Sequence, residues 1–251
     1  MTYLLVHGGG TTARYWDRLL PYLDHPHLAV DLPGRADKPA DLATLTVEEE
    51  VASVLADVEA AEVAGTIVLV AHSSGGLVAP GVVAGLAGRV AHVVLNAALV
   101  PTEGGCGLEG MQSRHAEGLA AAVEYAREEG TVITVPAPPA DPESFRRTYG
   151  GDPLDDETLA FVLDPLRCVT DTVNHYFQAV HWSVAAGVPL TYVVNERDRP
   201  IPVALQEEMI GRLPRDPPPR VVRLGGGHVP AVTDPEAFAA VLAEAARSIR
   251  P

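Results

Sequence analysis

Positive charge is scarce in this sequence of 251 residues. Lysine and arginine number 18 against 33 aspartates and glutamates, which gives a formal net charge of −15 at pH 7. Neither a nucleic acid nor a membrane is expected as a partner, because nucleic acids and anionic membranes bind proteins through positive charge. No apolar run approaches the roughly 20 residues that a membrane-spanning helix needs. Hydrophobic residues still make up 47% of the chain, so the composition predicts a soluble globular protein with a substantial core.

Cysteine is also rare, and no leader segment is expected. The two cysteines, Cys106 and Cys168, have no spacing that is typical of metal ligands. An apolar strand pattern begins at Tyr3, which leaves no room for a signal peptide before it. We therefore expect a cytoplasmic protein in which both thiols are reduced.

The stretch 67–76, Ile-Val-Leu-Val-Ala-His-Ser-Ser-Gly-Gly, joins a strand to a helix through a tight turn. Its β-branched beginning predicts a buried strand, and apolar residues after Gly76 predict the start of a helix. Ser73 lies at the apex, where a strained backbone pushes the hydroxyl out over the carboxyl end of a sheet. Ala71 and Gly75, two residues before and after it, are small enough to let strand and helix approach closely.

Two later strands end in segments with complementary chemistry. The predicted strand 189–194 is followed by a loop that contains Asp198, and the strand 221–224 is followed by glycines and His228. Carboxyl ends of parallel strands lie at one edge of a sheet, so these side chains are expected to meet Ser73. A serine attacks when a neutral imidazole takes its proton, and a buried carboxylate orients that imidazole. The sequence predicts Ser73 as nucleophile, His228 as general base and Asp198 as the orienting acid.

Other residues compete for these roles. Glu103 and Glu196 are alternative acids, because each follows a predicted strand. We expect His72, beside the nucleophile, to pack within the turn and to point away from its apex. We expect His7 to be structural. The remaining candidates are expected to be solvated: His115, His175 and His181.

Helices are predicted from capping signals and apolar spacing. Thr46 and Glu49 form a capping box in front of an apolar stripe. Proline follows Asp141 and Asp234, and proline at the first helical position after an aspartate is typical of a helix start. Two more helical segments are expected, 119–129 and 156–167.

A glycine-rich loop follows the first predicted strand, residues 3–6. Its sequence, His7 to Gly10, leaves backbone N–H groups free to face a ligand, and Trp16 with the leucines after it predicts a helix. This loop, the Ala-x-Ser-x-Gly turn and the chain order serine, aspartate, histidine resemble the α/β-hydrolase family. The motifs are most similar to its plant methylesterase and hydroxynitrile-lyase branch, although Ala71 replaces a glycine of the family pattern.

The resemblance implies an α/β-hydrolase fold, an α/β class with a mostly parallel six-stranded sheet and helices on both faces. Counting the predicted strands along the chain also gives six. The implied core domain consists of residues 1–100 and 187–251. Residues 101–186, which lack regular strand and helix alternation, are expected to form a helical cap, or lid, inserted between strands.

The resemblance also implies an oxyanion hole. Its donors are the N–H groups of Ser74, directly after the nucleophile, and of Gly9 in the glycine-rich loop. Gly8 is the alternative donor and an expected substrate contact. Among the aromatic side chains of the expected cap, Tyr176 and Trp182 are expected to contact the substrate.

The expected reaction is acyl transfer to water, which needs no cofactor or metal. Ser73 disfavours epoxide hydrolases and dehalogenases, and Gly8 and Val229 disfavour a hydroxynitrile lyase, whose threonine and lysine they replace. An apolar cap favours a small to medium, mainly uncharged ester or lactone as the small-molecule partner, since Arg146 and Arg147 are expected on a solvated face. A thioesterase and a non-hydrolytic receptor or cyclase are the alternatives. We expect a monomer or a homodimer.

Overall fold

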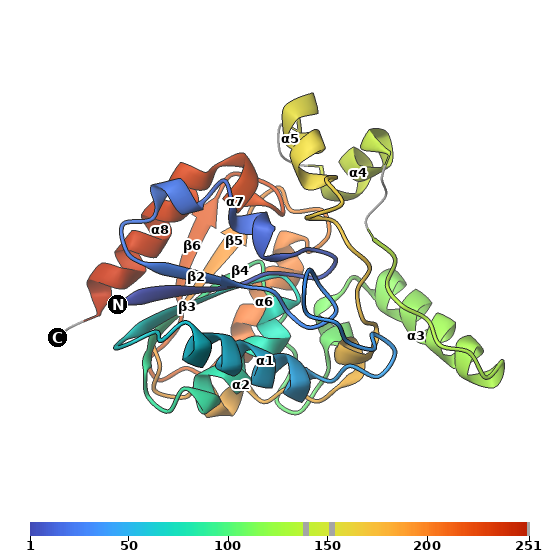
Figure 1. Cartoon of the computed structure of the whole chain (residues 1–251), viewed down its shortest axis with the longest axis horizontal. Coiled ribbons are helices and arrows are strands. Elements are labelled where there is room, and N and C mark those ends of the chain that lie inside the picture. Colours follow the sequence, from blue (N-terminus) through green and yellow to red (C-terminus); the bar gives the residue numbers. More distant parts are fainter. Residues whose placement is uncertain (138–140, 151–153, 250–251) are drawn as a thin grey trace.

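The computed structural model describes residues 1–137, 141–150 and 154–249. Its centre is a six-stranded sheet with the order β2-β1-β3-β4-β5-β6, and all neighbouring strands are parallel. The strands are β1 (Thr2–Val6), β2 (His27–Val30), β3 (Ile67–His72), β4 (Val90–Asn96), β5 (Leu190–Asn195) and β6 (Arg220–Leu224). Helices cover both faces (Figure 1). The predicted fold class and its six strands are confirmed.

Strand β3 shows how the sheet builds two cores. All six of its residues are buried, and alternate side chains point to opposite faces. Leu69 packs in the cluster that contains side chains of α1 (Val47–Ala60) and α2 (Gly75–Gly85). Val70 packs in the cluster that contains side chains of α8 (Pro235–Ser248). Both faces of the sheet are therefore covered, as an all-parallel sheet requires.

The strand order creates a crevice at the carboxyl end of β1. The chain forms β2 on one side of β1 and then returns to form β3 on the other side. The last residue of β1, Val6, pairs in register with Ala71 of β3. The loops after these two strands therefore begin side by side, at the point where open α/β sheets bind ligands.

The predicted helix starts are present. Thr46 accepts the Glu49 N–H at 3.1 Å, and the Glu49 carboxylate accepts the Thr46 N–H at 2.8 Å, which completes the capping box of α1. Asp141 accepts the N–H of Ser144 at 2.8 Å at the start of α4 (Pro142–Tyr149). Asp234 caps α8 in the same way. Within the described residues, no helix has both the length and the apolar character to cross a bilayer.

The prediction of a helix after the glycine-rich loop is wrong. The chain forms only two 3-10 turns there, η1 (Ala13–Trp16) and η2 (Leu20–Tyr22). Pro21 lies inside the second turn, and proline interrupts the hydrogen bonds of an α-helix. Trp16 and Leu19 are nevertheless fully buried. The apolar spacing therefore indicated which side chains are buried, but it did not indicate a regular helix.

Between β4 and β5 the described chain forms helices and turns but adds no strand to the sheet. They are η3 (Gly107–Gly110), α3 (Ser113–Glu128), α4, α5 (Asp156–Val162), η4 (Asn174–Phe177) and η5 (Trp182–Ala185). Helix α3 extends away from the body, and α4 and α5 lie together beyond the sheet (Figure 1). The η4 and η5 turns pack back into the core cluster of α1 and α2. The domain boundaries at 101 and 186 stay a prediction.

Helix α5 is shorter than expected. It ends at Val162, whereas apolar spacing predicts a helix up to residue 167. Asp164 and Pro165 turn the chain, because the Asp164 carboxylate accepts the N–H of Leu166 at 2.9 Å. This turn directs residues 166–171 toward the glycine-rich loop, where Thr11 and Cys168 form an antiparallel bridge.

Candidate active site

Ser73 occupies a strained turn between β3 and α2. Its φ angle is 51°, in the left-handed region that non-glycine residues rarely adopt. Gly75 allows the turn to close, because a Cβ there would lie 2.7 Å from the carbonyl oxygen of His7 and 3.1 Å from that of Val6. Ala71 is fully buried and fits without a glycine. The turn places Ser73 at the wall of a cavity.

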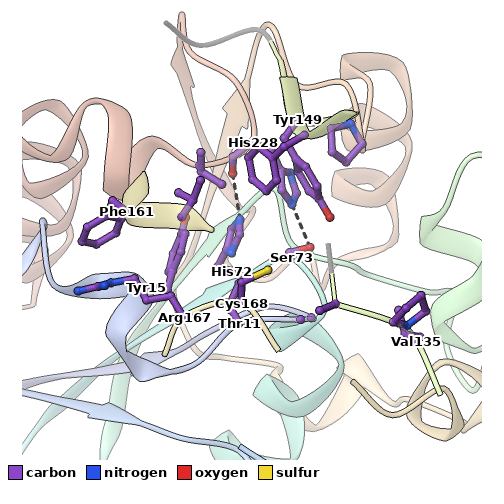
Figure 2. Close-up of a pocket in the computed structure, with 18 of the residues that line it drawn as sticks. Thr11, Tyr15, His72, Ser73, Val135, Tyr149, Phe161, Arg167, Cys168 and His228 are labelled. Atoms are coloured by element: carbon purple, nitrogen blue, oxygen red, sulfur yellow. Dashed lines mark hydrogen bonds between the residues drawn. The ribbon is translucent and has the colours of Figure 1, made fainter. Parts of the chain in front are cut away.

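His228 bridges Ser73 and Asp198. Its Nε2 lies 3.1 Å from the Ser73 Oγ (Figure 2). Its Nδ1 lies 2.7 Å from the Asp198 Oδ2. A carboxylate only accepts hydrogen bonds, so Nδ1 carries the proton and Nε2 is free to accept the serine hydroxyl. The three side chains predicted from separate strand ends therefore form one hydrogen-bonded line.

The Asp198 carboxylate is held in place on its other side. Its side chain is fully buried, and its Oδ1 accepts the N–H of Ile201 at 2.8 Å. The alternative acids lie elsewhere. Glu103 binds His181 and the Ser183 hydroxyl, and Glu196 lies 4.0 Å from Arg223, so neither contacts His228.

His72 lies differently from the expectation. It is buried, but its ring faces the cavity and does not point away from it. The ring is stacked on that of Tyr15, with centroids 4.7 Å apart, and lies 4.7 Å from the His228 ring. Its Nε2 lies 2.9 Å from the main-chain oxygen of His228 (Figure 2). The position next to the serine therefore contributes to the site.

The glycine-rich loop lies opposite the turn of Ser73. A Cβ on Gly9 would lie 3.2 Å from the Ser74 Oγ, and a Cβ on Gly8 would lie 2.8 Å from the Ser73 Cβ. Gly9 is at the cavity wall, whereas Gly8 is buried behind it. The expectation that Gly8 contacts substrate is therefore wrong, because the nucleophile turn covers it.

His7 has a structural position at the start of this loop, as expected. Its Nε2 accepts the N–H of Leu32 at 3.2 Å, so its proton is on Nδ1, which donates to the Gly8 carbonyl oxygen at 2.8 Å. Burial lowers the pKa of His7 to about 3. The imidazole is thus neutral, and its two hydrogen bonds keep one orientation.

The cavity in front of Ser73 has a volume of about 380 Å³. Five aromatic side chains contribute to its wall: Tyr15, Phe145, Tyr149, Phe161 and Tyr176. Burial raises the pKa of Tyr149 to about 12 and also raises the pKa of the Cys168 thiol. Both groups are therefore neutral near pH 7, and the wall is mainly apolar.

Among the described residues, one side chain with a permanent charge, Arg167, also reaches this wall. Its guanidinium lies 2.7 Å from carboxylate oxygens of both Asp17 and Asp164 and stacks over the Phe161 ring, 4.0 Å from its centroid. Its charge is therefore balanced within the protein. No local sequence pattern predicts Arg167, Cys168 or Tyr15 at the site, because the chain path after α5 and after the glycine-rich loop brings them there.

Of the two aromatic residues expected to contact substrate, only Tyr176 lies at the cavity. The expectation for Trp182 is wrong, since its side chain is 1% exposed and packs in the core cluster of α2. His175 is not solvated but fully buried, with its Nδ1 3.1 Å from the Glu50 carboxylate. His115 is exposed, and His181 is exposed beside Glu103.

Metal ions in proteins are commonly held by His, Cys, Asp and Glu side chains. No group of three or more of them, in residues 1–137, 141–150 and 154–249, has a suitable arrangement.

Several solved structures have a similar fold. An extracellular α/β-hydrolase from a Paenibacillus species superposes with a TM-score of 0.77 at 19% identity, covering 98% of each chain. A pyrethroid hydrolase from Sphingobium faniae JZ-2 gives 0.77 at 20% identity, over 99% of this chain and 98% of the other. The methylesterase MES16 from Arabidopsis gives 0.73 at 17% identity, over 99% of each chain. No curated protein has a matching sequence.

A sequence model described as the "Alpha/beta hydrolase family" matches residues 3–241. The matched range begins in β1 and ends in α8. It therefore includes residues of all six strands, the turn of Ser73 and the loops that carry Asp198 and His228. This chain belongs to the α/β-hydrolase family.

Proposed function

We propose that this protein is a serine hydrolase that cleaves a carboxylic ester or lactone through an acyl-serine intermediate. The observation that carries the proposal is the line of hydrogen bonds from Ser73 through His228 to Asp198, with distances of 3.1 Å and 2.7 Å. Nucleophile, base and orienting carboxylate each have a geometry suited to acyl transfer.

In the first half of the reaction, Ser73 Oγ bonds to the carbonyl carbon and its proton passes to His228 Nε2. The tetrahedral intermediate then collapses, the bond to the leaving oxygen breaks, and His228 returns the proton to that oxygen. Water repeats the sequence on the acyl-serine and releases the acid and the free serine. Asp198 stays ionised throughout and stabilises the imidazolium that forms in each half.

The N–H groups of Gly9 and Ser74 serve as the oxyanion donors. Ser74 precedes α2 directly, and the first N–H groups of a helix have no partner within the helix. Gly9 lies across from Ser74 at the cavity wall. Removal of one such donor typically slows catalysis by about 10² to 10³-fold.

The cavity favours a small to medium, uncharged substrate. Its wall is aromatic, and the charge of Arg167 is balanced by Asp17 and Asp164. A carboxylate substrate would therefore leave water without gaining a free cation. The structural neighbours include a pyrethroid hydrolase and a methylesterase, and this agrees with an ester substrate.

The test is hydrolysis of p-nitrophenyl butyrate and labelling by a fluorophosphonate probe. The wild-type protein is expected to turn over the ester and to be labelled at Ser73, and Ser73→Ala is expected to lose both while it stays folded by circular dichroism. Ser113→Ala, at the exposed start of α3, is the matched control and is expected to keep both. Turnover by Ser73→Ala at the wild-type rate would refute the proposal.

A further inference from the structure

Four ionisable side chains that the proposed chemistry does not use are fully buried near the glycine-rich loop. They are Arg35, Glu50, Asp171 and His175. Arg35 pairs with both carboxylates, and His175 pairs with Glu50. Buried charges are costly to folding even when they are paired.

Asp171 connects this cluster to the glycine-rich loop. Its Oδ2 accepts the N–H of Gly10 at 2.9 Å and lies 2.9 Å from the position that a Cβ on Gly9 would take. Its Oδ1 accepts hydrogen bonds from Arg35 and, at 2.7 Å, from the N–H of Thr172. Both carboxylate oxygens therefore face donors, one of which belongs to the loop.

Asp171 holds the peptide between Gly9 and Gly10, and other residues hold the peptide between Gly8 and Gly9. The Gly8 carbonyl oxygen accepts from His7 Nδ1 at 2.8 Å and from the Thr11 hydroxyl at 2.9 Å. The C=O and N–H of a trans peptide point in opposite directions, so the Gly9 N–H points away from these donors. Within the part of the chain that the structure describes, that N–H has no acceptor, and Gly9 lines the cavity.

Further hydrogen bonds join the segment that carries Asp171 to the glycine-rich loop. The N–H of Val169 donates to the Gly10 oxygen at 2.9 Å, and the Thr12 hydroxyl donates to the Leu166 oxygen at 2.7 Å. The segment that carries Asp171 therefore runs along the loop and bonds to it at several points.

We propose that Asp171 is a positioning residue for the oxyanion hole: it fixes the Gly10 N–H so that the N–H of Gly9 stays directed at the substrate carbonyl oxygen. This inference rests on the proposed serine hydrolase function. Arg35 has a matching role, because an unbalanced carboxylate beside Gly9 would oppose the negative charge that develops on that oxygen. A segment outside the sheet core thus determines the geometry of a catalytic loop.

Asp171→Asn tests the inference. An amide has one acceptor and one donor end, so it cannot serve both Gly10 and Arg35, which are donors. With p-nitrophenyl butyrate we expect kcat to fall by about 10-fold or more and KM to change by less than about 3-fold, because the oxyanion forms only in the transition state. Affinity for a trifluoromethyl ketone, which forms an oxyanion on Ser73, is expected to fall by the same factor as kcat/KM.

Asp24→Asn is the matched control. Asp24 accepts a hydrogen bond from the Tyr3 hydroxyl at 2.8 Å near the amino end of β1, away from the cavity, and the variant is expected to keep the wild-type kcat. A wild-type protein that neither hydrolyses the ester nor binds the ketone would refute the proposed function. An active wild type with a folded Asp171→Asn variant of equal kcat and ketone affinity would overturn the role of Asp171 alone.

If Asp171→Asn does not fold, a second variant and a measurement on the wild-type protein still test the inference. The double change Arg35→Met with Asp171→Leu removes both charges of the Arg35–Asp171 pair and leaves Glu50 paired with His175. Removing both charges is less costly than leaving one of them unpaired, and the same loss of kcat and ketone affinity is expected. Wild-type values in that folded variant would overturn the inference.

In the wild-type protein, the Gly10 amide is expected to exchange with solvent more slowly than the Gly9 amide. Equal exchange of the two would also contradict the inference.

Discussion

His72 donates a hydrogen bond from Nε2 to the main-chain carbonyl oxygen of His228, at 2.9 Å. A carbonyl only accepts, so Nε2 must carry the proton. Burial holds the pKa of His72 well below its usual value, and the ring is therefore a neutral donor near pH 7. Because His72 precedes Ser73 in the chain, this bond joins the backbone of the serine turn to the backbone of the His228 loop.

Replacing His72 is expected to loosen the His228 loop. In His72→Phe the ring can still stack on Tyr15, but the buried His228 carbonyl loses its donor, which costs about 1–3 kcal/mol of stability. We expect kcat for p-nitrophenyl butyrate to fall about 10-fold, equivalent to about 1.4 kcal/mol. His72→Gln, whose amide can donate, is expected to recover part of the loss. Equal kcat in His72→Phe and the wild type would contradict this role.

Gly75 is expected to tolerate no side chain. In Gly75→Ala the new Cβ would lie 2.7 Å from the His7 oxygen, which is backbone and cannot rotate away. The free energy of unfolding, measured with urea, is expected to fall by about 2 kcal/mol or more. Gly118→Ala in α3 is the control, since nothing lies within 4 Å of that position, and it is expected to gain up to about 1 kcal/mol. A Gly75→Ala variant as stable as the wild type would show that the turn can open.

The balanced charge of Arg167 predicts a selectivity change. In the double variant Asp17→Asn with Asp164→Asn, the guanidinium stays over Phe161 but loses both carboxylates. The ratio of kcat/KM for mono-p-nitrophenyl succinate to that for p-nitrophenyl butyrate is expected to rise about 10-fold, or about 1.4 kcal/mol. Asp156→Asn, which removes the exposed partner of Arg146, is expected to leave the ratio unchanged. If the kcat/KM ratio is also unchanged in the double variant, the loss of the two carboxylates does not free Arg167 to bind an anionic substrate, and the prediction is wrong.

Acid is expected to destabilise the fold through three buried histidines. Burial lowers the pKa of His7 to about 3 and of His92 to about 4, and it lowers the pKa of His72 well below its usual value. Below about pH 6.5 the three imidazoles bind protons in the unfolded chain but not in the folded chain. Stability should therefore fall by about 1.4 kcal/mol per pH unit for each histidine, or about 4 kcal/mol for all three, until the folded pKa values are reached.

Urea unfolding between about pH 7 and about pH 5, followed by tryptophan fluorescence, measures this dependence. His92 bonds to Thr191 and Ser248 at the end of the protein opposite the cavity, so His92→Gln should lower the slope by about one proton without changing ester turnover. A free energy of unfolding that does not change over this range would contradict the neutral state of these histidines.

The candidate triad could be located from the sequence because each member follows a strand with a strong local signal. The β-branched runs before Ser73, Asp198 and His228 are confirmed as β3, β5 and β6. A parallel sheet then brings their ends to one edge without any knowledge of the loops. The capping box of α1 was predictable for the same reason, since both partners lie within one turn of the chain.

The cavity wall could not be predicted, because its members meet through long-range packing. Trp182 and Tyr176 are both aromatic and near in sequence, yet η5 turns Trp182 into the core while η4 leaves Tyr176 at the cavity. His175 was expected in solvent, but its partner Glu50 lies 125 residues earlier in the chain. Neither residue follows a predicted strand, so no local signal in the sequence brings the two side chains together.

The bond between Asp171 and Gly10 has a consequence for protein engineering. One way to build a chimeric hydrolase would be to exchange the segment between β4 and β5 for that of another family member. Here the exchange would remove Asp171, whereas its counter-charge, Arg35, would stay because it lies before β3 in the chain. A functional graft of residues 101–186 would therefore have to carry a carboxylate at the equivalent place, or be accompanied by neutralisation of residue 35.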